Sequence, residues 1–410
     1  MARLKNTLTI ILAGGRGDRL QPLTLERAKP AVPFGGKYRI IDSTLSNCIN
    51  SGLRKIVVLI QYKSLSLDRH LHLAWNLLNP ELHEYIMAVP PQQRISQDWY
   101  RGTADAVRQN IFLINDEDPD FVFVLSGDHV YMMDYGEMYN FSLLRGTEAV
   151  IGAIPVPIEE ASRFGILAVD EEYRILRFDE KPKTPRPIPG KPTHALASMG
   201  IYLFSTRLLK RYLVEDTRKK SNHDFGRAIL PQMVTDCPVF AYPFEDPKSR
   251  APHYWRDIGT LDAYWEANMD LITVDPPFNL YDQSWPLRTY QGQFPPAKFV
   301  FADNPDTKNG RMGHALDSIV CGGSIVSGSR VQNCVLSPAV HIDNYADVRD
   351  SILMENVIVG KHAKIKRTII DKDVTIPPGT HIGYDLETDA KRFTVTASGL
   401  VVISKGMKLE

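Results

Sequence analysis

The residues from Leu12 to Pro30 read LAGGRGDRLQPLTLERAKP and directly follow a short apolar run. Glycine has no side chain, so a glycine-rich loop can bring its backbone N–H groups close to phosphate oxygens. Cations such as Arg16 and Lys29 can add charge-assisted hydrogen bonds to the same oxygens. The glycine spacing differs from the GxGxxG fingerprint of dinucleotide-binding folds. The stretch therefore favours a bound triphosphate over a nicotinamide cofactor, and the alternative is a surface turn with solvated cations.

Two aspartates are candidate metal ligands. Asp128 lies in LSGDHVY, directly after the apolar run 121–125. Ligands of open α/β sheets bind at the carboxyl ends of strands, and Mg²⁺ in nucleotide enzymes takes one or two carboxylates and completes its shell with phosphates. Asp257 in HYWRDIGT precedes a glycine turn and is the second candidate. Each aspartate could instead cap a helix or form an Asx turn, but we favour a Mg²⁺ site at Asp128 and Asp257.

Lys181 is a candidate for binding a second phosphate group. It stands in FDEKP, between an acidic residue and a proline, after a strand-like segment. A lysine held there could meet a phosphate as a point charge. The EKP sequence is common on protein surfaces, so this signal carries little weight by itself.

The composition narrows the classes of function. The chain has 410 residues with 48 Lys plus Arg and 48 Asp plus Glu, and this neutral balance argues against non-specific nucleic-acid binding. No apolar run approaches the length of a membrane span, and the run 8–13 is interpreted as a buried strand because Arg16 and Arg19 follow it at once. The cysteines show no CxxC spacing; they are Cys48, Cys237, Cys321 and Cys334. We therefore expect a cytoplasmic protein with reduced thiols that binds neither nucleic acid nor membrane.

The first two-thirds of the chain alternate short apolar strands with helical patterns. Strands are expected at 56–60, 121–125, 149–154 and 199–204, and a helix is expected at 105–114. This alternation is typical of an α/β fold with a mostly parallel sheet covered on both faces. We expect a Rossmann-like domain over 1–275, followed by a proline-rich linker at 276–297.

Apolar residues recur every six positions in the last part of the chain. One such series is Ile319, Ile325 and Val331, and two more follow between 340 and 382. A six-residue apolar period is the hexapeptide signature of a parallel β-helix. We expect this fold over 298–410, with a β-sandwich of irregular strands as the alternative because alternation by two is also present.

Together these stretches resemble the bacterial ADP-glucose pyrophosphorylases, or glucose-1-phosphate adenylyltransferases, over essentially the whole chain. LAGGRGDRLQPLT followed by RAKP is similar to the signature of sugar-nucleotide pyrophosphorylases in general. The motifs similar to those of the adenylyl branch are FGGKYRIIDSTLSNCINSG, PPQQR, WYRGTADAV, PVPIEEASRFG, SMGIY, HDFG and YWRDIGTLDAYW. The resemblance implies a nucleotidyltransferase domain followed by a left-handed β-helix. It also implies transfer of the adenylyl group of ATP to α-D-glucose 1-phosphate, the first committed step of bacterial glycogen synthesis.

The resemblance also implies a role for each site residue. The residues matching the ATP site are Leu12, Ala13, Gly14, Gly15, Arg16, Lys29, Gln61, Gln93, Gly102, Thr103 and Asp128. The residues matching the glucose 1-phosphate site are Tyr100, Gly165, Glu180, Lys181, Ser198, Asp224, Trp255 and Asp257. The residues expected to act in catalysis are Arg16, Lys29 and Asp128, with Mg²⁺ as the cofactor at Asp128 and Asp257. The attacking phosphate oxygen is already anionic, so no general base is required.

Regulation and assembly are further implications. The resemblance predicts a homotetramer and anionic metabolite effectors in a cleft between the two domains. The cations expected to bind the effector are Arg27, Lys37, Arg39, Lys391 and Arg392. Glu26 would repel a second phosphate, and Pro33 replaces a histidine, so a monophosphate or carboxylate activator is favoured.

Three alternatives remain open on the sequence. The nucleotide could be dTTP or UTP, because base choice rests on a few hydrogen bonds. The chain could be a non-catalytic regulatory subunit, although Arg16, Lys29 and Asp128 are all present. A fused acyltransferase would need a longer β-helix than this chain has room for.

Overall fold

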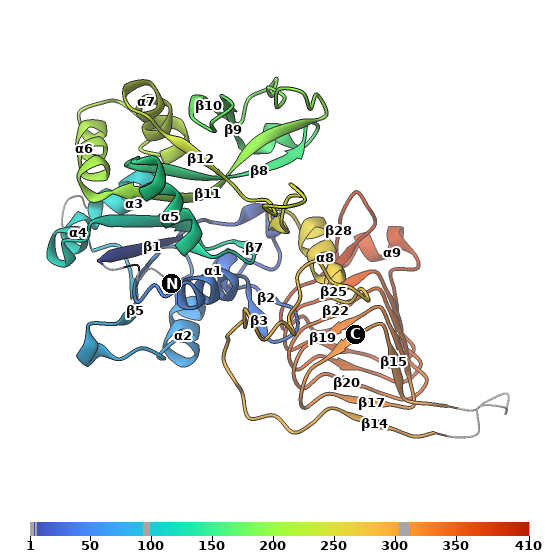
Figure 1. Cartoon of the computed structure of the whole chain (residues 1–410). Coiled ribbons are helices and arrows are strands. Elements are labelled where there is room, and N and C mark those ends of the chain that lie inside the picture. The colour runs from blue at the N-terminus through green and yellow to red at the C-terminus, as the bar shows by residue number, and fades with distance from the viewer. Residues whose placement is uncertain (1–3, 5, 93–98, 303–310, 410) are drawn as a thin grey trace.

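The computed structural model describes residues 4, 6–92, 99–302 and 311–409. An α/β domain forms the N-terminal part, and a β-helix packs against it (Figure 1). The α/β domain is built on a nine-stranded sheet in the order β10-β9-β11-β6-β1-β4-β5, with β8 beside β11 and β12 beside β8. Its strands are β1 (Thr7–Ala13), β4 (Lys55–Ile60), β5 (Tyr85–Val89), β6 (Phe121–Ser126), β8 (Ala149–Pro157), β9 (Gly165–Val169), β10 (Ile175–Glu180), β11 (His194–Ser205) and β12 (Phe240–Pro243).

The half of the sheet that holds the glycine-rich loop is parallel. Strands β5, β4, β1 and β6 all run in the same direction. Strand β11 runs antiparallel to β6, β8 and β9, so the parallel arrangement ends there. The carboxyl ends of β1, β4 and β6 therefore lie side by side at one edge, where α/β folds bind ligands.

Helices cover both faces of the sheet (Figure 1). They are α1 (Ile40–Asn50), α2 (Leu65–Ala74), α3 (Thr103–Gln109), α4 (Ile111–Glu117), α5 (Tyr135–Arg145), α6 (Thr206–Thr217), α7 (Leu230–Asp236) and α8 (Leu261–Asp270). Short helical turns are η1 (Asp18–Leu20), η2 (Lys29–Ala31), η3 (Pro80–Leu82), η4 (Ala161–Arg163) and the π-helix η5 (Phe225–Ile229). None of the helices in the described ranges has the length and apolar character needed to cross a membrane.

Alternate residues of β1 supply two cores. Leu8 and Ile10 pack toward α3, α6 and α7, whereas Ile11 and Ala13 pack toward α1, α2 and α5. This is the two-residue period of a strand buried on both faces. The helix expected at 105–114 is two helices, because the chain breaks at Asn110, whose side-chain amide donates to the Tyr100 hydroxyl and to the Ala106 carbonyl.

The C-terminal domain is a left-handed parallel β-helix made of three sheets, as the hexapeptide period predicted. The strands of the first sheet are β14 (Lys298–Val300), β17 (Ile325–Ser327), β20 (His341–Ile342), β23 (Ile358–Val359) and β26 (Thr375–Ile376). Those of the second are β15 (His314–Leu316), β18 (Arg330–Gln332), β21 (Asp347–Arg349), β24 (Lys364–Lys366) and β27 (His381–Ile382). Those of the third are β16 (Ile319–Val320), β19 (Val335–Leu336), β22 (Ile352–Leu353), β25 (Thr368–Ile370), β28 (Thr394–Val395) and β29 (Val401–Ile403).

Each coil of the β-helix places one apolar side chain per face above the same face of the coil before it. Val331 pairs with Val348, Val348 with Ile365, and Ile365 with Ile382. All four side chains are buried, so the coils form one continuous column of apolar contacts. The helix α9 (Leu386–Ala390) and strand β28 lie at the C-terminal end of this column (Figure 1).

The proline-rich segment between α8 and β14, residues 271–297, packs against the α/β domain as an extended strap. It contains neither helix nor strand, but the Trp285 indole donates to the Asn47 side-chain oxygen at 2.8 Å. The Arg288 backbone N–H donates to the Ser46 hydroxyl at 2.9 Å, and Phe278 is buried. The strap is therefore fixed on helix α1.

The two domains share an apolar core. Val32 and Ile258 of the first domain lie in the same buried cluster as Val335 and Ile369 of the β-helix. A continuous apolar contact of this kind holds two domains in one orientation.

Candidate active site

A cleft of about 560 Å³ opens at the carboxyl ends of β1, β4 and β6. Most of the residues matched to ATP binding line it, together with two matched to the sugar phosphate; the lining includes Leu12, Ala13, Gly14, Gly15, Arg16, Lys29, Gln61, Tyr100, Gly102, Thr103, Asp128 and Asp224. Gln93 lies outside the described residues. The fold thus gathers residues that are far apart in the sequence into one hollow.

The glycine-rich loop is shaped by close packing. A Cβ atom on Gly14 would lie 3.0 Å from the Cβ of Gln61, whereas one on Gly15 would meet nothing within 4 Å. Gly17 has φ +68°, a conformation that favours glycine. The Thr24 hydroxyl donates to the Gly17 carbonyl at 2.8 Å and fixes the far side of the loop. The loop therefore presents bare backbone to the cleft, as a phosphate-binding loop requires.

Arg16 stands at the mouth of the cleft. Its guanidinium lies 4.9 Å from the ring centre of Tyr62 and donates to the Tyr62 hydroxyl at 3.3 Å. The Tyr62 ring stacks on Trp99 at 5.2 Å. The sequence around Tyr62 does not reveal this contact, because an aromatic residue after a strand can equally be part of the core.

A buried lysine lies between the two candidate metal ligands. The Lys29 ammonium is 2.7 Å from Oδ2 of Asp128 and 3.2 Å from Oδ1 of Asp257. The short strands β7 (His129–Tyr131) and β13 (Trp255–Asp257) pair antiparallel and put Asp257 opposite His129. This pairing brings Asp257 beside Asp128.

The charges of this cluster shift the acid–base equilibria in the directions expected for an ion pair. Burial alone would raise the pKa of Asp128, but the charges of Lys29 and His129 and the hydrogen bond from Ser126 hold it well below its usual range. Burial would lower the pKa of Lys29, but the two carboxylates raise it. Asp128 is therefore ionised and Lys29 protonated at neutral pH.

His129 is a further member of the cluster that the sequence analysis did not name. Its Nε2 lies 3.5 Å from Asp128 and 3.7 Å from Asp257, and the three side chains could hold one metal ion. Its buried Nδ1 has no hydrogen-bond partner in the described part of the chain. Two carboxylates beside a phosphate-binding loop suit a hard cation such as Mg²⁺, so the residues fit the expected metal. The DHV sequence alone could not reveal that His129 points back toward Asp257.

Thr103 and Asp224 join the cleft to a second hollow. The Thr103 hydroxyl donates to Asp224 at 2.8 Å and accepts from the Phe225 backbone N–H at 3.0 Å. A Cβ atom on Gly102 would collide with the backbone carbonyl oxygens of Asn222 and His223, so only glycine fits there. Gly102 and Asp224 line both hollows.

The second hollow, of about 480 Å³, holds part of the set matched to glucose 1-phosphate. Glu180 and Lys181 line it, and the Lys181 ammonium lies 3.3 Å from Glu180. A Cβ atom on Gly165 would collide with the Phe178 ring at 2.5 Å and would lie 3.0 Å from the Glu180 carboxylate, so this glycine leaves room for both side chains.

Four residues of the set matched to glucose 1-phosphate line neither hollow in this structure; they are Gly165, Ser198, Trp255 and Asp257. Ser198 is buried in β11, and Trp255 packs its ring against His129 and Phe164. The buried Trp255 indole N–H has no hydrogen-bond partner among the described residues.

Comparisons with known proteins agree with this geometry. Residues 8–274 match the Nucleotidyl transferase family, and residues 295–403 match the family GlmU-like, C-terminal hexapeptide. A glucose-1-phosphate adenylyltransferase of Rhodopirellula baltica is 54% identical over 98% of this chain and 91% of its own. Similar proteins of the same name are found in Methylococcus capsulatus, 51% identical over 98% of this chain and 93% of its own, and in Anaeromyxobacter sp., 52% identical over the whole of both chains. The chain belongs to the glucose-1-phosphate adenylyltransferase family.

The resemblance to glucose-1-phosphate adenylyltransferases also predicted an effector site, and three of its five cations line hollows between the domains. A hollow of about 570 Å³ between the domains is lined by Arg27 and Arg39. Lys37 lines a smaller adjoining hollow of about 90 Å³ together with Arg39. Arg27 forms a buried two-pronged ion pair with Asp371, at 2.9 and 3.0 Å.

Lys391 and Arg392 are the two remaining cations predicted to bind the effector. They follow α9, line neither of these hollows, and Arg392 faces Asp389 at 3.8 Å. The β-helix instead contributes Lys372 and Lys405. Helix α9 sits at the end of the β-helix column, whereas Lys372 lies two residues beyond the end of strand β25 and lines the hollow beside the α/β domain.

Proposed function

We propose that this chain transfers the adenylyl group of ATP to α-D-glucose 1-phosphate, forming ADP-glucose and releasing pyrophosphate. The observation that carries the proposal is the pair of adjoining hollows, which share Gly102 and Asp224. One contains the glycine-rich loop and Asp128 of the candidate metal site, and the other contains Lys181. Family membership favours ATP and glucose 1-phosphate as the two occupants.

The side chains suit an in-line displacement without a general base. A phosphate monoester is already anionic at neutral pH, so catalysis consists of holding its oxygen in line with the α-phosphorus of ATP. Lys181 would hold the sugar phosphate, and the loop 14–17 would hold the triphosphate. Arg16 and Lys29 would neutralise the charge that develops on the pyrophosphate.

A divalent cation fits this scheme. Asp128 and Asp257 would hold Mg²⁺, with His129 beside them, and when bound the ion would supply positive charge next to the reacting phosphates. Arg16, Arg19 and Lys29 line the cleft together with three aspartates, so the bound cation would add the positive charge that favours a polyphosphate.

The decisive experiment is pyrophosphate release from glucose 1-phosphate with each common nucleoside triphosphate in turn. ATP should give the highest kcat/KM. A higher value with dTTP or UTP would overturn the choice of nucleotide, and no release with any of them would support a non-catalytic subunit.

We also propose that anionic metabolites regulate the enzyme at the hollow between the domains, and that its product serves bacterial glycogen synthesis. Support for the regulatory site comes from the gathering of Arg27, Arg39, Lys372 and Lys405 in one hollow. Three of these cations already have acidic partners: Arg27 pairs with Asp371, Lys372 with Glu355, and Lys405 with Glu26. This residual charge suits a monophosphate or carboxylate better than a bisphosphate.

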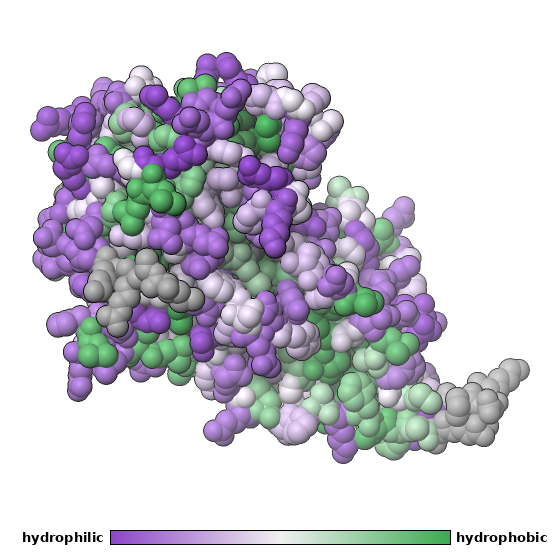
Figure 2. All heavy atoms as spheres, in the orientation of Figure 1, coloured by the Kyte–Doolittle hydropathy of each residue, from purple (hydrophilic) through white to green (hydrophobic). Residues whose placement is uncertain are grey.

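Homotetramer formation is the last part of the proposal. Strand β14 ends its sheet and leaves one edge without a partner among the described strands. Large apolar side chains near this end of the β-helix are exposed; they are Phe299, Phe301, Met312 and Leu316. Figure 2 shows apolar residues gathered over this end of the molecule. An open edge beside exposed apolar side chains favours association with another copy, which light scattering would measure.

A further inference from the structure

A third hollow, of about 730 Å³, opens on the outer side of the one that contains Lys181. Its walls are formed by the end of α6, the loop 218–224, η5 and α7. Four of its lining residues are cations: Arg101, Lys219, Lys220 and Arg227. We call this hollow the outer basic groove.

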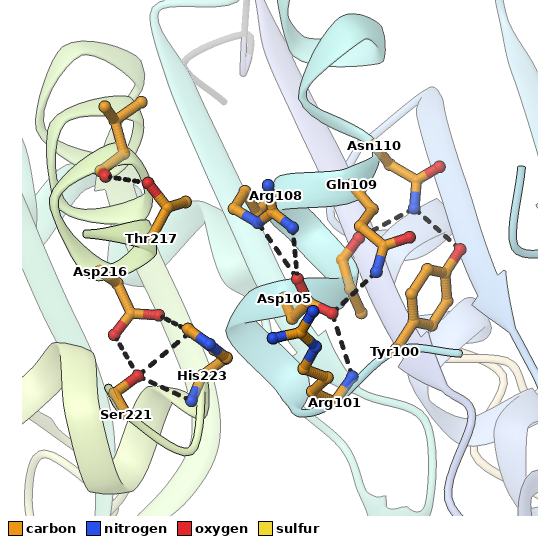
Figure 3. Close-up of polar contacts among 12 residues, drawn as sticks. Tyr100, Arg101, Asp105, Arg108, Gln109, Asn110, Asp216, Thr217, Ser221 and His223 are labelled. Atoms are coloured by element: carbon orange, nitrogen blue, oxygen red, sulfur yellow. Dashed lines mark hydrogen bonds and ion pairs between the residues drawn. The ribbon is translucent and has the colours of Figure 1, made fainter. Parts of the chain in front are cut away.

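The loop that carries two of these cations is fixed by a buried carboxylate. Asp216 accepts a hydrogen bond from the Ser221 hydroxyl at 2.6 Å and lies 2.6 Å from Nδ1 of His223 (Figure 3). Asp216 is 6% exposed and is the one carboxylate among the described lining residues. Because Ser221 and His223 already use it, Asp216 fixes the loop and leaves the groove positively charged.

The opposite wall is fixed in the same way. The Arg101 backbone N–H donates to Asp105 at 3.0 Å, and Asp105 also accepts from the side chains of Arg108 and Gln109 (Figure 3). The two walls then join, because the Ala104 and Asp105 backbone N–H groups both donate to the His223 carbonyl at 3.0 Å. The backbones that carry the cations are therefore held in place by buried hydrogen bonds.

The outer basic groove is continuous with the hollow that contains Lys181. Arg101, Ser221, Asn222, His223 and Arg227 line both. An anion that enters from solvent can therefore pass from the cations of the groove to Lys181 without crossing an apolar barrier. Lys219 already donates to the Gln232 side chain at 2.6 Å, and an ammonium group has two further N–H donors.

We propose that the outer basic groove is a second binding site for a phosphate monoester dianion, through which the anionic substrate reaches the inner hollow. Its link to catalysis rests on the proposed sugar-phosphate role of the Lys181 hollow. The phosphate can come from glucose 1-phosphate itself or from inorganic phosphate, since both present the same oxygens to the cations. A cationic groove that leads to a binding site raises the association rate of an anion by about tenfold or more at low ionic strength.

The test is a double variant, Lys219→Gln and Lys220→Gln, which are cations of the outer basic groove that do not line the Lys181 hollow. The matched control removes the same charge from an exposed face of the β-helix through Lys361→Gln and Lys364→Gln. Calorimetry without nucleotide should show two glucose 1-phosphate molecules per wild-type chain and per control chain, but one per groove variant. Inorganic phosphate should bind to the wild type, and its affinity for the groove variant should be measurably lower.

Kinetics provide the second readout. At low ionic strength, kcat/KM for glucose 1-phosphate should be about tenfold lower in the groove variant than in the wild type, whereas kcat and the KM for ATP should not change. The dependence of kcat/KM for glucose 1-phosphate on salt concentration should largely disappear in the variant. One glucose 1-phosphate per wild-type chain, or equal phosphate binding by wild type and groove variant, would overturn the proposal.

The two proposals fail separately. If Lys181→Ala binds as many glucose 1-phosphate molecules as the wild type, with the same affinity, the proposed function is wrong. The inorganic phosphate measurement still decides whether the outer basic groove binds a dianion.

Discussion

The ammonium group of Lys29 lies 2.7 Å from Oδ2 of Asp128, in a position where it also reaches Asp257 at 3.2 Å. Lys29 is 8% exposed, so its charge is balanced almost entirely by these two carboxylates. The same two carboxylates are the candidate metal ligands. Lys29 is therefore the counter-ion of the candidate metal ligands, and we expect it to influence both catalysis and metal affinity.

Asp128→Asn should abolish most of the activity and leave the fold intact. The neutral amide lacks the negative charge that holds a divalent cation and forms an ion pair with Lys29. Loss of an interaction made mainly in the transition state costs roughly 3 kcal/mol, about a hundredfold in kcat. Steady-state rates and a thermal melt would measure this. The exposed Asp116→Asn on α4 is the control, and near-normal turnover of the Asp128 variant would remove this residue from the metal site.

Lys29→Gln should bind free Mn²⁺ more tightly than the wild type when no nucleotide is present. Removing one positive charge a few ångströms from the metal position removes a repulsion of a few kcal/mol at an effective dielectric constant near about 20, so we expect a gain of about tenfold or more. Titration followed by the paramagnetic signal of free Mn²⁺ measures the affinity directly. Equal affinities in the two proteins would show that Lys29 and the metal do not compete for these carboxylates.

Lys181→Ala should raise KM for glucose 1-phosphate about tenfold or more, with little change in KM for ATP. A point charge on the sugar phosphate predicts this asymmetry. Lys183→Ala, an exposed lysine two residues away, is the matched control. Equal increases for both substrates would place Lys181 outside the sugar-phosphate site.

Effector responses should depend on Arg39 and not on Lys391. Arg39 lines both hollows between the domains, whereas Lys391 lines neither. A panel of phosphorylated sugars and three-carbon acids should change the wild-type rate by at least about twofold. Arg39→Ala should lose this response and Lys391→Ala should keep it, and the reverse result would restore the C-terminal cations to the effector site.

Cys321 should react slowly with iodoacetamide at neutral pH. Burial raises the pKa of the Cys321 thiol to about 11, against the opposing charge of Lys37. The thiol form therefore stabilises the fold below the unfolded pKa of about 8.5, and this contribution is lost as the pH rises through the folded value. Labelling followed by mass spectrometry should accelerate about tenfold per pH unit between pH 8 and 10. The denatured chain is the reference, and a rate for the folded chain that levels off near pH 9 would contradict the raised pKa.

The local chemistry of this protein is determined by short stretches of sequence. The glycines at 14, 15 and 17 already specify a phosphate-binding loop, because open space around the backbone and a positive φ at Gly17 are properties that only glycine supplies at low cost. The six-residue apolar period likewise predicts the β-helix. Each coil repeats the same burial pattern, so the repeat is visible along the sequence itself.

Contacts between residues far apart in the sequence were decided by the tertiary structure alone. Asp257 reaches Asp128 because β13 pairs with β7, and Lys372 rather than Lys391 lines the hollow between the domains because of the order in which the coils stack. The outer basic groove depends on Asp216 folding the loop 218–223 toward Arg101, a contact with no local signal in the sequence. Periodicity and turn chemistry act over a few neighbouring residues, whereas the strand register and domain packing that assemble these sites depend on contacts between residues far apart in the chain.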